Sequence, residues 1–205
     1  MTVSNQKQQL FDRWAPFYDV LFPSVFYQAT HIRLLDYVEL PENAQVLDLG
    51  CGTGRLLDRL AAKYPDLHGT GLDFSAEMLR QARSSNRHRP RLIFVQGDVV
   101  SLRFANGQFD TVFSTLSFLH YSAPEQVFAE VYRVLRPGGR FYLADPAPVA
   151  STGAWHLPVS PKGIRLYSQN MRQHMGMQAG LDCIKHRFLL GPTLLTIFGK
   201  PSSFQ

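Results

Sequence analysis

Three short apolar runs of the sequence end beside residues that suit the binding of a nucleoside. The run at 45–50 leads into the loop Asp48-Leu49-Gly50-Cys51-Gly52-Thr53-Gly54, and two later runs close on Asp73 and Asp98. Glycines let the backbone turn tightly and approach a ligand with no Cβ in the way. The N-terminus of a following helix offers N–H groups to a carboxylate or a phosphate. The loop at 48–54 therefore predicts a binding site for an anionic group.

The spacing of the glycines separates this loop from two common phosphate-binding loops. The pattern GxxxxGK[ST], which grips nucleotide phosphates, is absent. A dinucleotide loop of the form GxGxxG would need glycine where Arg55 stands, because the glycines here lie at 50, 52 and 54. This spacing disfavours a pyrophosphate ligand without excluding one.

The two later acids predict recognition of a sugar and a base. A carboxylate at Asp73 suits two ribose hydroxyls, with which it forms charge-assisted hydrogen bonds. Asp98 is placed to accept from an exocyclic amine such as adenine N6, and the N–H of Val99 to reach a ring nitrogen. Phe74 and Met78 are candidates to enclose the base. Together these residues predict an adenosine with a carboxylate or amino-acid tail, beside a positive centre that the acids favour.

Alternating strand-like and helix-like stretches from about 45 to 145 predict a parallel sheet that positions these residues. The strand-like runs lie at 45–50, 66–73, 91–98, 109–119 and 141–145. In open doubly wound sheets, ligands bind beyond the carboxyl ends of the strands, which brings the glycine loop and the acids together. Two further runs, 181–190 and 193–200, are split by Gly191-Pro192 and predict an antiparallel hairpin at the sheet edge.

The flanking segments are expected to form the acceptor side of the site. Residues 1–40 predict two helices separated near Pro23, acting as an N-terminal helical lid. The four prolines in 146–163 predict an irregular crossover loop. Apolar residues then recur at helical spacing, which predicts a helix that ends near 180. They are Ile164, Tyr167, Met171 and Met175.

Length and composition exclude several classes of protein. The 205 residues, 45% of them hydrophobic, are expected to form a single domain spanning 1–205 around one core, which rules out disorder over most of the chain. The start has no apolar signal segment, and no stretch approaches the roughly 18 apolar residues of a membrane span. We therefore expect a soluble, cytoplasmic protein. Cys51 and Cys183 form no CxxC and no metal-ligand spacing, so we expect no metal site.

Five segments in this order resemble the class I S-adenosylmethionine-dependent methyltransferases, in particular the small-molecule branch. They are VLDLGCGTG (46–54), GLDFSAEML (71–79), GDV (97–99), FDTVFSTLSFLHY (109–121) and VYRVLRPGGRFYLADP (131–146). The resemblance implies an α/β, Rossmann-like fold. Its sheet has seven mostly parallel strands in the order 3-2-1-4-5-7-6, with the last strand antiparallel and helices on both faces.

The resemblance also implies S-adenosyl-L-methionine as the cofactor. It implies that Asp48 and Gly50 lie near the methionine amino group, with Cys51, Gly52 and Gly54 in the same loop. Asp73 would then bind the ribose, and Ser114 would bind the methionine moiety through its backbone carbonyl. Asp98 and Val99 would contact the adenine.

The N-terminal segment FDRWAPFYD (11–19) resembles the opening element of bacterial phospholipid N-methyltransferases and ubiquinone/menaquinone C-methyltransferases. This implies a helix that closes over the cofactor and places Tyr18 at the site. The aromatic residues nearby favour a small apolar or amphipathic acceptor, quinone-, lipid- or natural-product-like, or a peripheral approach to a membrane surface. Methyl transfer needs collinear reactants above all. Where a proton must leave the acceptor, His120 is the first candidate base, followed by Tyr18 and Tyr121.

Two other functions stay open at this stage. One is a catalytically silent S-adenosylmethionine-binding partner protein. The other is an RNA methyltransferase that uses the arginine cluster at 80–91, which belongs to a chain of net charge +5. Against a nucleic-acid substrate, Ser114-Thr115-Leu116-Ser117 stands where base-amino methyltransferases carry an Asn/Asp-Pro-Pro-aromatic run. We therefore expect a small-molecule acceptor and no obligate protein partner.

Overall fold

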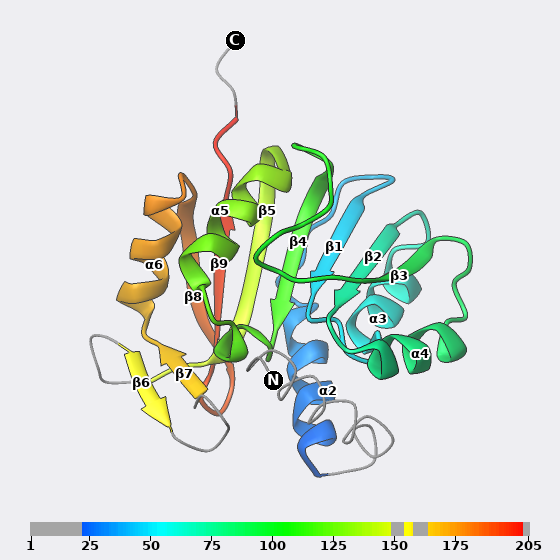
Figure 1. Cartoon of the computed structure of the whole chain (residues 1–205), viewed down its shortest axis with the longest axis horizontal. Helices are drawn as coiled ribbons and strands as arrows, with labels where there is room; N and C mark the ends of the chain where they lie inside the picture. The colour runs from blue at the N-terminus through cyan, green and yellow to red at the C-terminus, as the bar shows by residue number, and fades with distance from the viewer. Residues whose placement is uncertain (1–21, 149–153, 158–163, 203–205) are drawn as a thin grey trace, which may run out of the picture.

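The protein is built on a seven-stranded sheet with helices on both faces (Figure 1). A computed structural model describes residues 22–148, 154–157 and 164–202. The strand order is β3-β2-β1-β4-β5-β9-β8. The strands are β1 (Gln45–Leu49), β2 (His68–Asp73), β3 (Leu92–Gln96), β4 (Phe109–Thr115), β5 (Leu135–Pro146), β8 (Asp182–Leu190) and β9 (Thr193–Gly199).

The observed pairing confirms the predicted topology. Strands β1 to β5 pair in parallel, whereas β9 is antiparallel to both β5 and β8. Because β8 and β9 are the sixth and seventh strands of this sheet, its order is 3-2-1-4-5-7-6. The predicted C-terminal hairpin is likewise confirmed, with its turn at Gly191-Pro192.

Helices cover the two faces of the sheet in two groups. They are α2 (Phe22–Leu34), α3 (Arg55–Lys63), α4 (Ala76–Ser85), the 3₁₀ turn η2 (Phe118–His120), α5 (Pro124–Val134) and α6 (Gln169–Gln178). Leu34, Leu57 and Leu79 bring α2, α3 and α4 into one apolar cluster, and Phe128 and Met175 bring α5 and α6 into the other. A sheet covered on both faces explains why every residue of β4 except Asp110 is buried.

Hydroxyl caps mark where two of these helices begin. The Ser75 Oγ accepts from the Met78 N–H (3.2 Å), which confirms the predicted N-cap of α4. The Ser168 Oγ accepts from the Met171 N–H (3.4 Å) and caps α6 in the same way. Helix α2 contains Pro23 in its first turn, where a missing N–H costs no hydrogen bond. The helix predicted before Pro23 lies outside the described residues.

One part of the sequence-based prediction for 146–180 is wrong. Ile164 and Tyr167 do not belong to the predicted helix, since they lie in β7 (Ile164–Tyr167), which pairs antiparallel with β6 (Ala154–Leu157). The predicted crossover loop at 146–163 therefore contains the first strand of a short hairpin. The helical spacing of Tyr167 is a coincidence, because this ring is buried against Phe118, with ring centroids 5.3 Å apart. The Ser168 cap is the local signal that separates the strand from the helix.

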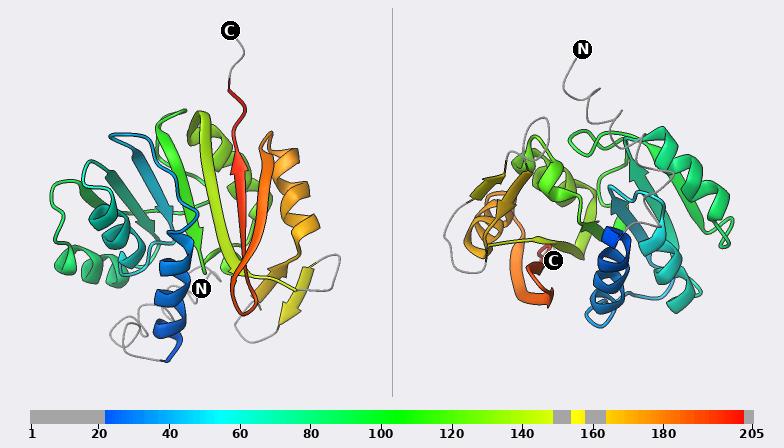
Figure 2. Two further views of the ribbon diagram at one scale, coloured as in Figure 1. Left: turned by 180° about the vertical axis from the view of Figure 1, so that it is seen from behind. Right: turned by 90° about the horizontal axis from the view of Figure 1, so that it is seen from below.

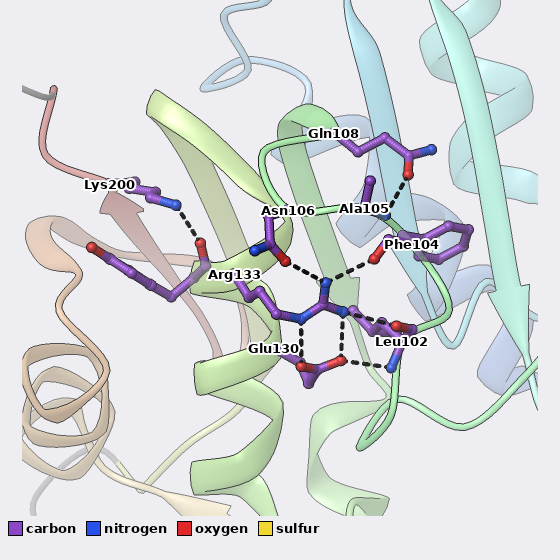
Figure 3. A network of polar contacts seen from close by, with 9 residues as sticks. Leu102, Phe104, Ala105, Asn106, Gln108, Glu130, Arg133 and Lys200 are labelled. Atoms are coloured by element: carbon purple, nitrogen blue, oxygen red, sulfur yellow. Dashed lines mark hydrogen bonds and ion pairs between the residues drawn. The ribbon is translucent and has the colours of Figure 1, made fainter.

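A polar network holds the connection between β3 and β4 in place (Figure 3). Arg133 of α5 donates to the carbonyl oxygens of Leu102 (2.8 Å) and Phe104 (2.7 Å) and to Oδ1 of Asn106 (2.9 Å). Glu130 pairs with Arg133 (2.7 Å) and accepts from the Leu102 N–H (2.7 Å). One guanidinium thus satisfies several backbone groups of a connection that has no secondary structure of its own.

Candidate active site

The glycine loop after β1 has a backbone that only glycine adopts without strain. The φ angles are +68° at Gly50, +52° at Gly52 and +78° at Gly54. Gly50 is also confined by its surroundings, because an added Cβ would lie 2.6 Å from the Cβ of Ser117. At Gly52 an added Cβ would meet nothing within 4 Å. The loop is therefore packed on one side and faces open space on the other.

Asp73 joins the ends of β1 and β2. Its side chain is buried, with 7% of the residue exposed. Oδ2 accepts from the Gly52 N–H (2.8 Å), and Oδ1 accepts from the Ser75 N–H (2.9 Å). A carboxylate offers about four lone-pair sites, so further donors can still bind. The predicted ribose-binding acid thus lies against the glycine loop, as the convergence of strand ends requires.

Asp48 has a buried carboxyl oxygen that receives no hydrogen bond from the described residues. Only 1% of the residue is exposed, and Oδ1 has no hydrogen-bond partner among the described residues. Burial, and to a smaller extent the negative charge of Asp73, raise the pKa of Asp48 well above its ordinary value. A buried acceptor without a donor costs about 1–3 kcal/mol. An ammonium group in the adjoining cavity would supply both the missing donor and the missing charge.

Helix α2 passes the carboxyl ends of β1 and β4 (Figures 1 and 2). Residues of these three elements line a cavity. Its volume is about 50 Å³, and it opens to solvent. Its walls come from four parts of the fold. The glycine loop contributes Asp48 and the residues from Gly50 to Thr53, the start of α3 contributes Arg55 and Leu56, β4 and its end contribute Thr115 and Leu116, and α2 contributes Tyr27, Gln28 and His31.

The sequence predicted that 1–40 covers the site, but it did not identify Tyr27, Gln28 and His31 of α2 as the residues that line the cavity. Tyr27, Gln28 and His31 lie at positions i, i+1 and i+4 of the helix, a spacing that places i and i+4 on the same face. Three contacts from α3 and the residue after it hold α2 and the following turn. Arg59 donates to Gln28 Oε1 (3.0 Å), Lys63 to the Leu35 carbonyl (2.7 Å), and the Tyr64 hydroxyl to the Val38 carbonyl (2.8 Å).

A chain of hydroxyl groups closes the site beneath the loop. The Ser117 Oγ donates to the Leu49 carbonyl (3.0 Å), and lies 3.0 Å from Ser114 Oγ and 2.9 Å from the Tyr121 hydroxyl. Burial raises the pKa of Tyr121 above its ordinary range. Tyr121, one of the candidate bases, is therefore protonated at neutral pH and acts as a hydrogen-bonding group.

The remaining predicted cofactor residues lie in different surroundings. Met78 is buried on α4, and Phe74 is partly exposed, with its carbonyl accepting from the Gln96 side chain (2.9 Å). Asp98 and Val99 follow β3, where the exposed Asp98 carboxylate accepts from the Val100 N–H (3.1 Å). These residues are not among those that line the described cavity.

Three predicted site residues remain, His120, Tyr18 and Cys51. His120 ends η2 and is not among the lining residues of the described cavity, and Tyr18 lies outside the described residues. Cys51 lines the cavity but is only 8% exposed. Burial, with the nearby charges of Asp73 and Asp48, raises the pKa of the Cys51 thiol, so this cysteine is a neutral packing residue.

The arginine cluster at 80–91 is largely engaged within the fold. Arg80 pairs with Glu77 (2.6 Å), and Arg83 donates to the Phe94 carbonyl (2.7 Å). Arg91 donates to the Leu67 carbonyl (3.0 Å). Guanidinium groups that hold backbone carbonyls are less available to phosphates. This arrangement favours a structural role for the cluster over RNA binding.

The described ranges contain neither a metal-binding cluster nor a membrane-spanning helix. No group of three or more His, Cys, Asp or Glu side chains within 22–148, 154–157 and 164–202 is arranged to hold a metal ion. In the same ranges, no helix combines the length and the apolar character that crossing a bilayer requires.

Comparisons with known proteins agree on one family. A family model described as a methyltransferase domain matches residues 46–139. The demethylmenaquinone methyltransferase of Thermus thermophilus is 30% identical over 205 residues, which cover 96% of this chain and 87% of that protein. The 2-phytyl-1,4-naphtoquinone methyltransferase of Thermosynechococcus vestitus is 36% identical over 143 residues, covering 67% of this chain and 63% of that protein. The match to this second relative thus spans less than two thirds of its length.

Solved structures share the fold at lower sequence identity. The [4+2]-cyclase SpnF superposes with a TM-score of 0.83 at 18% identity, covering 98% of both chains. An S-adenosylmethionine dependent methyltransferase from Mesorhizobium loti gives a TM-score of 0.71 at 17% identity, covering 83% of this chain and 97% of the other. With the glycine loop, the strand-end acids and the relatives in agreement, this chain belongs to the S-adenosylmethionine-dependent methyltransferases, and its cofactor is S-adenosyl-L-methionine.

Proposed function

We propose that this protein methylates a small, apolar or amphipathic acceptor of the quinol type. The single observation that carries the proposal is the cavity itself, which the cofactor loop and α2 both line. Tyr27 and Leu116 give this space apolar surface, while Gln28, His31 and Thr115 give it polar groups. The printed names of two relatives, a demethylmenaquinone and a naphtoquinone methyltransferase, support an acceptor of this class.

Three groups of this chain fit the cofactor in the proposed complex. The unpartnered Oδ1 of Asp48 fits the ammonium of the methionine moiety. The Asp73 carboxylate, beside the glycine loop, fits the ribose hydroxyls, and the open space above Gly52 leaves room for the ligand to approach the backbone. Asp98, Val99, Phe74 and Met78 remain the proposed adenine contacts, and the Ser114 carbonyl a contact of the methionine moiety.

The chemistry requires positioning more than acid or base strength. S-adenosylmethionine supplies a methyl group that is already activated by its sulfonium. The protein must hold the acceptor in line with that methyl group, and good alignment alone contributes about 7–11 kcal/mol to such reactions. The hydrogen-bonded glycine loop and the α2 helix, fixed by Arg59, provide two rigid walls for this purpose.

The outer face of α2 supports the proposal of a peripheral membrane contact. Val25 is 64% exposed and Ile32 is 57% exposed, and both lie on the helix that borders the cavity. Apolar side chains at this place would bring the cavity close to a lipid surface that contains an apolar acceptor. The proposed compartment is the cytoplasm, and no obligate protein partner is part of the proposal.

An acceptor screen with a labelled methyl donor tests the proposed function. The panel contains a reduced, demethylated naphthoquinone with a prenyl tail, a fatty acid, a phospholipid and a short RNA. We expect label in the reduced naphthoquinone. Transfer to RNA alone would favour the nucleic-acid alternative. Cofactor binding without transfer to any acceptor would favour the silent partner protein.

A further inference from the structure

His31 is a histidine inside the cavity that has no assigned role. It lies on α2, and its Nε2 is 3.2 Å from the Oγ1 of Thr115 at the end of β4. Its Nδ1 is shielded from solvent and has no hydrogen-bond partner among the described residues. A buried imidazole nitrogen without a partner is uncommon and costs about 1–3 kcal/mol. The missing partner therefore points to a ligand.

The same cavity holds a second polar atom in the same state. The Oδ1 of Asp48 is buried without a partner, and Asp48 and His31 both line the cavity. Beside them, Leu116 has a φ of +55°, a left-handed conformation that costs a non-glycine residue about 1–3 kcal/mol and that clusters at functional sites. The two unpartnered atoms come from different elements, β1 and α2. Asp48 serves the cofactor side, which leaves His31 for the other reactant.

The charge state of His31 suits a place near a sulfonium. Burial, together with the positive charge of Arg59, lowers the pKa of His31 to about 4. The imidazole is therefore neutral at pH 7, and it adds no positive charge next to the cofactor. Two other charged residues, Arg55 and Asp48, also line the cavity. A neutral imidazole has one nitrogen that accepts a hydrogen bond or a proton.

We propose that His31 is a catalytic residue that binds the phenol-type hydroxyl of the acceptor and receives its proton during methyl transfer. This step rests on the proposed function. As the bond from the acceptor to the methyl carbon forms, the carbon–sulfur bond breaks and its electron pair stays on sulfur as a neutral thioether. The hydroxyl proton passes to the free imidazole nitrogen and then to solvent. His31 replaces His120 in this role because it lines the described cavity and His120 does not.

A weak base is sufficient for this step. An acceptor that gains a methyl group on its oxygen or its ring carbon becomes cationic, and its hydroxyl proton then becomes far more acidic than it was. The proton therefore leaves late, when a neutral imidazole of low basicity can take it. Thr115 orients the ring through Nε2, as a base needs a group that orients it.

The variants His31→Ala and His31→Asn test the proposal, with His174→Asn as the matched control. His174 is an exposed residue of α6 on another part of the molecule. Asparagine keeps an amide that accepts a hydrogen bond and cannot carry the proton. Calorimetry first measures S-adenosylhomocysteine, then a prenylated 1,4-naphthohydroquinone added without oxygen to the S-adenosylhomocysteine complex. We expect all four proteins to bind S-adenosylhomocysteine alike, and His31→Ala to bind the naphthohydroquinone at least about tenfold more weakly.

Turnover separates proton transfer from binding. We expect His31→Asn to keep KM within about threefold and to lose about a hundredfold or more in kcat, whereas His174→Asn matches the wild type. A wild-type S-adenosylhomocysteine complex that does not bind the naphthohydroquinone would overturn the proposal, as would an unchanged kcat in His31→Asn. Both results are compatible with normal binding of S-adenosylhomocysteine, so they leave the proposed function standing. A wild-type protein that does not bind S-adenosylhomocysteine would instead refute the proposed function itself.

Discussion

Alanine substitutions at Gly50 and Gly52 form a matched pair that tests the geometry of the cofactor loop. Both glycines have a positive φ, +68° and +52°, in the same loop. They differ in the space around them. A Cβ at Gly50 would lie 2.6 Å from the Cβ and 2.9 Å from the Oγ of Ser117, whereas a Cβ at Gly52 would meet nothing within 4 Å.

The expected loss of stability follows from these two terms. The left-handed conformation costs alanine about 1–2 kcal/mol at either position. Gly50→Ala adds overpacking, which costs about 1–3 kcal/mol in a filled site. Ser117 cannot turn away freely, because its Oγ is bonded to the Leu49 carbonyl and the Tyr121 hydroxyl. We therefore expect Gly50→Ala to lose about 2–5 kcal/mol and Gly52→Ala about 1–2 kcal/mol.

Urea unfolding of both variants, with S-adenosylhomocysteine titrations beside it, measures these effects. The methyl group of Gly52→Ala points into the space proposed for the cofactor. This variant should stay folded and lose at least about tenfold in affinity, since a ligand must move away from the added atom. Equal losses of unfolding free energy in the two variants would refute the assignment of the packed and open sides of the loop.

Three further predictions concern buried polar groups. Burial raises the pKa of Asp48, so the wild type should lose stability as the pH rises above the ordinary carboxyl range, and Asp48→Asn should not. Urea midpoints at pH 5 and 8 measure this difference, and the variant should also bind S-adenosylhomocysteine more weakly. Arg172 is fully buried and donates to the carbonyl oxygens of Tyr167 and Leu194, so Arg172→Met should lower the free energy of unfolding in urea by about 3–5 kcal/mol. A loss below about 1 kcal/mol would contradict this. His31 has a pKa of about 4 in the folded protein against 6.5 in the unfolded chain, so its neutral form contributes to stability above pH 6.5. This contribution, about 3 kcal/mol, is lost as the pH falls to about 4. The difference in unfolding free energy between wild type and His31→Asn should therefore shrink over this range, and a constant difference would contradict the lowered pKa.

The sheet and its strand-end acids could be predicted because their signals are local. Apolar runs, the glycine spacing and the Ser75 cap each act within a few residues, and the parallel arrangement then places Asp48 and Asp73 at one edge. The acids had one further property that no local pattern gives. The unpartnered oxygen of Asp48 depends on what surrounds it in three dimensions.

Which residues of α2 line the cavity could not be predicted for a similar reason. His31 and Thr115 are 84 residues apart in the chain, and helical periodicity does not say which end of a sheet a helix crosses. The β6–β7 hairpin was missed because its strands are four residues long and lie among prolines. The arginine cluster gave only a charge pattern, while its backbone partners Phe94 and Leu67 come from distant positions.

The central claim is that the ends of β1 and β2 bind the cofactor, and titration calorimetry with S-adenosylhomocysteine tests it most directly. The account predicts one-to-one binding in the micromolar range. Asp73→Asn should weaken it at least about tenfold, since a charge-assisted pair to the ribose is lost, while the exposed Asp182→Asn should bind as the wild type does. No heat with S-adenosylhomocysteine, together with a clear signal from a nicotinamide dinucleotide, would contradict it.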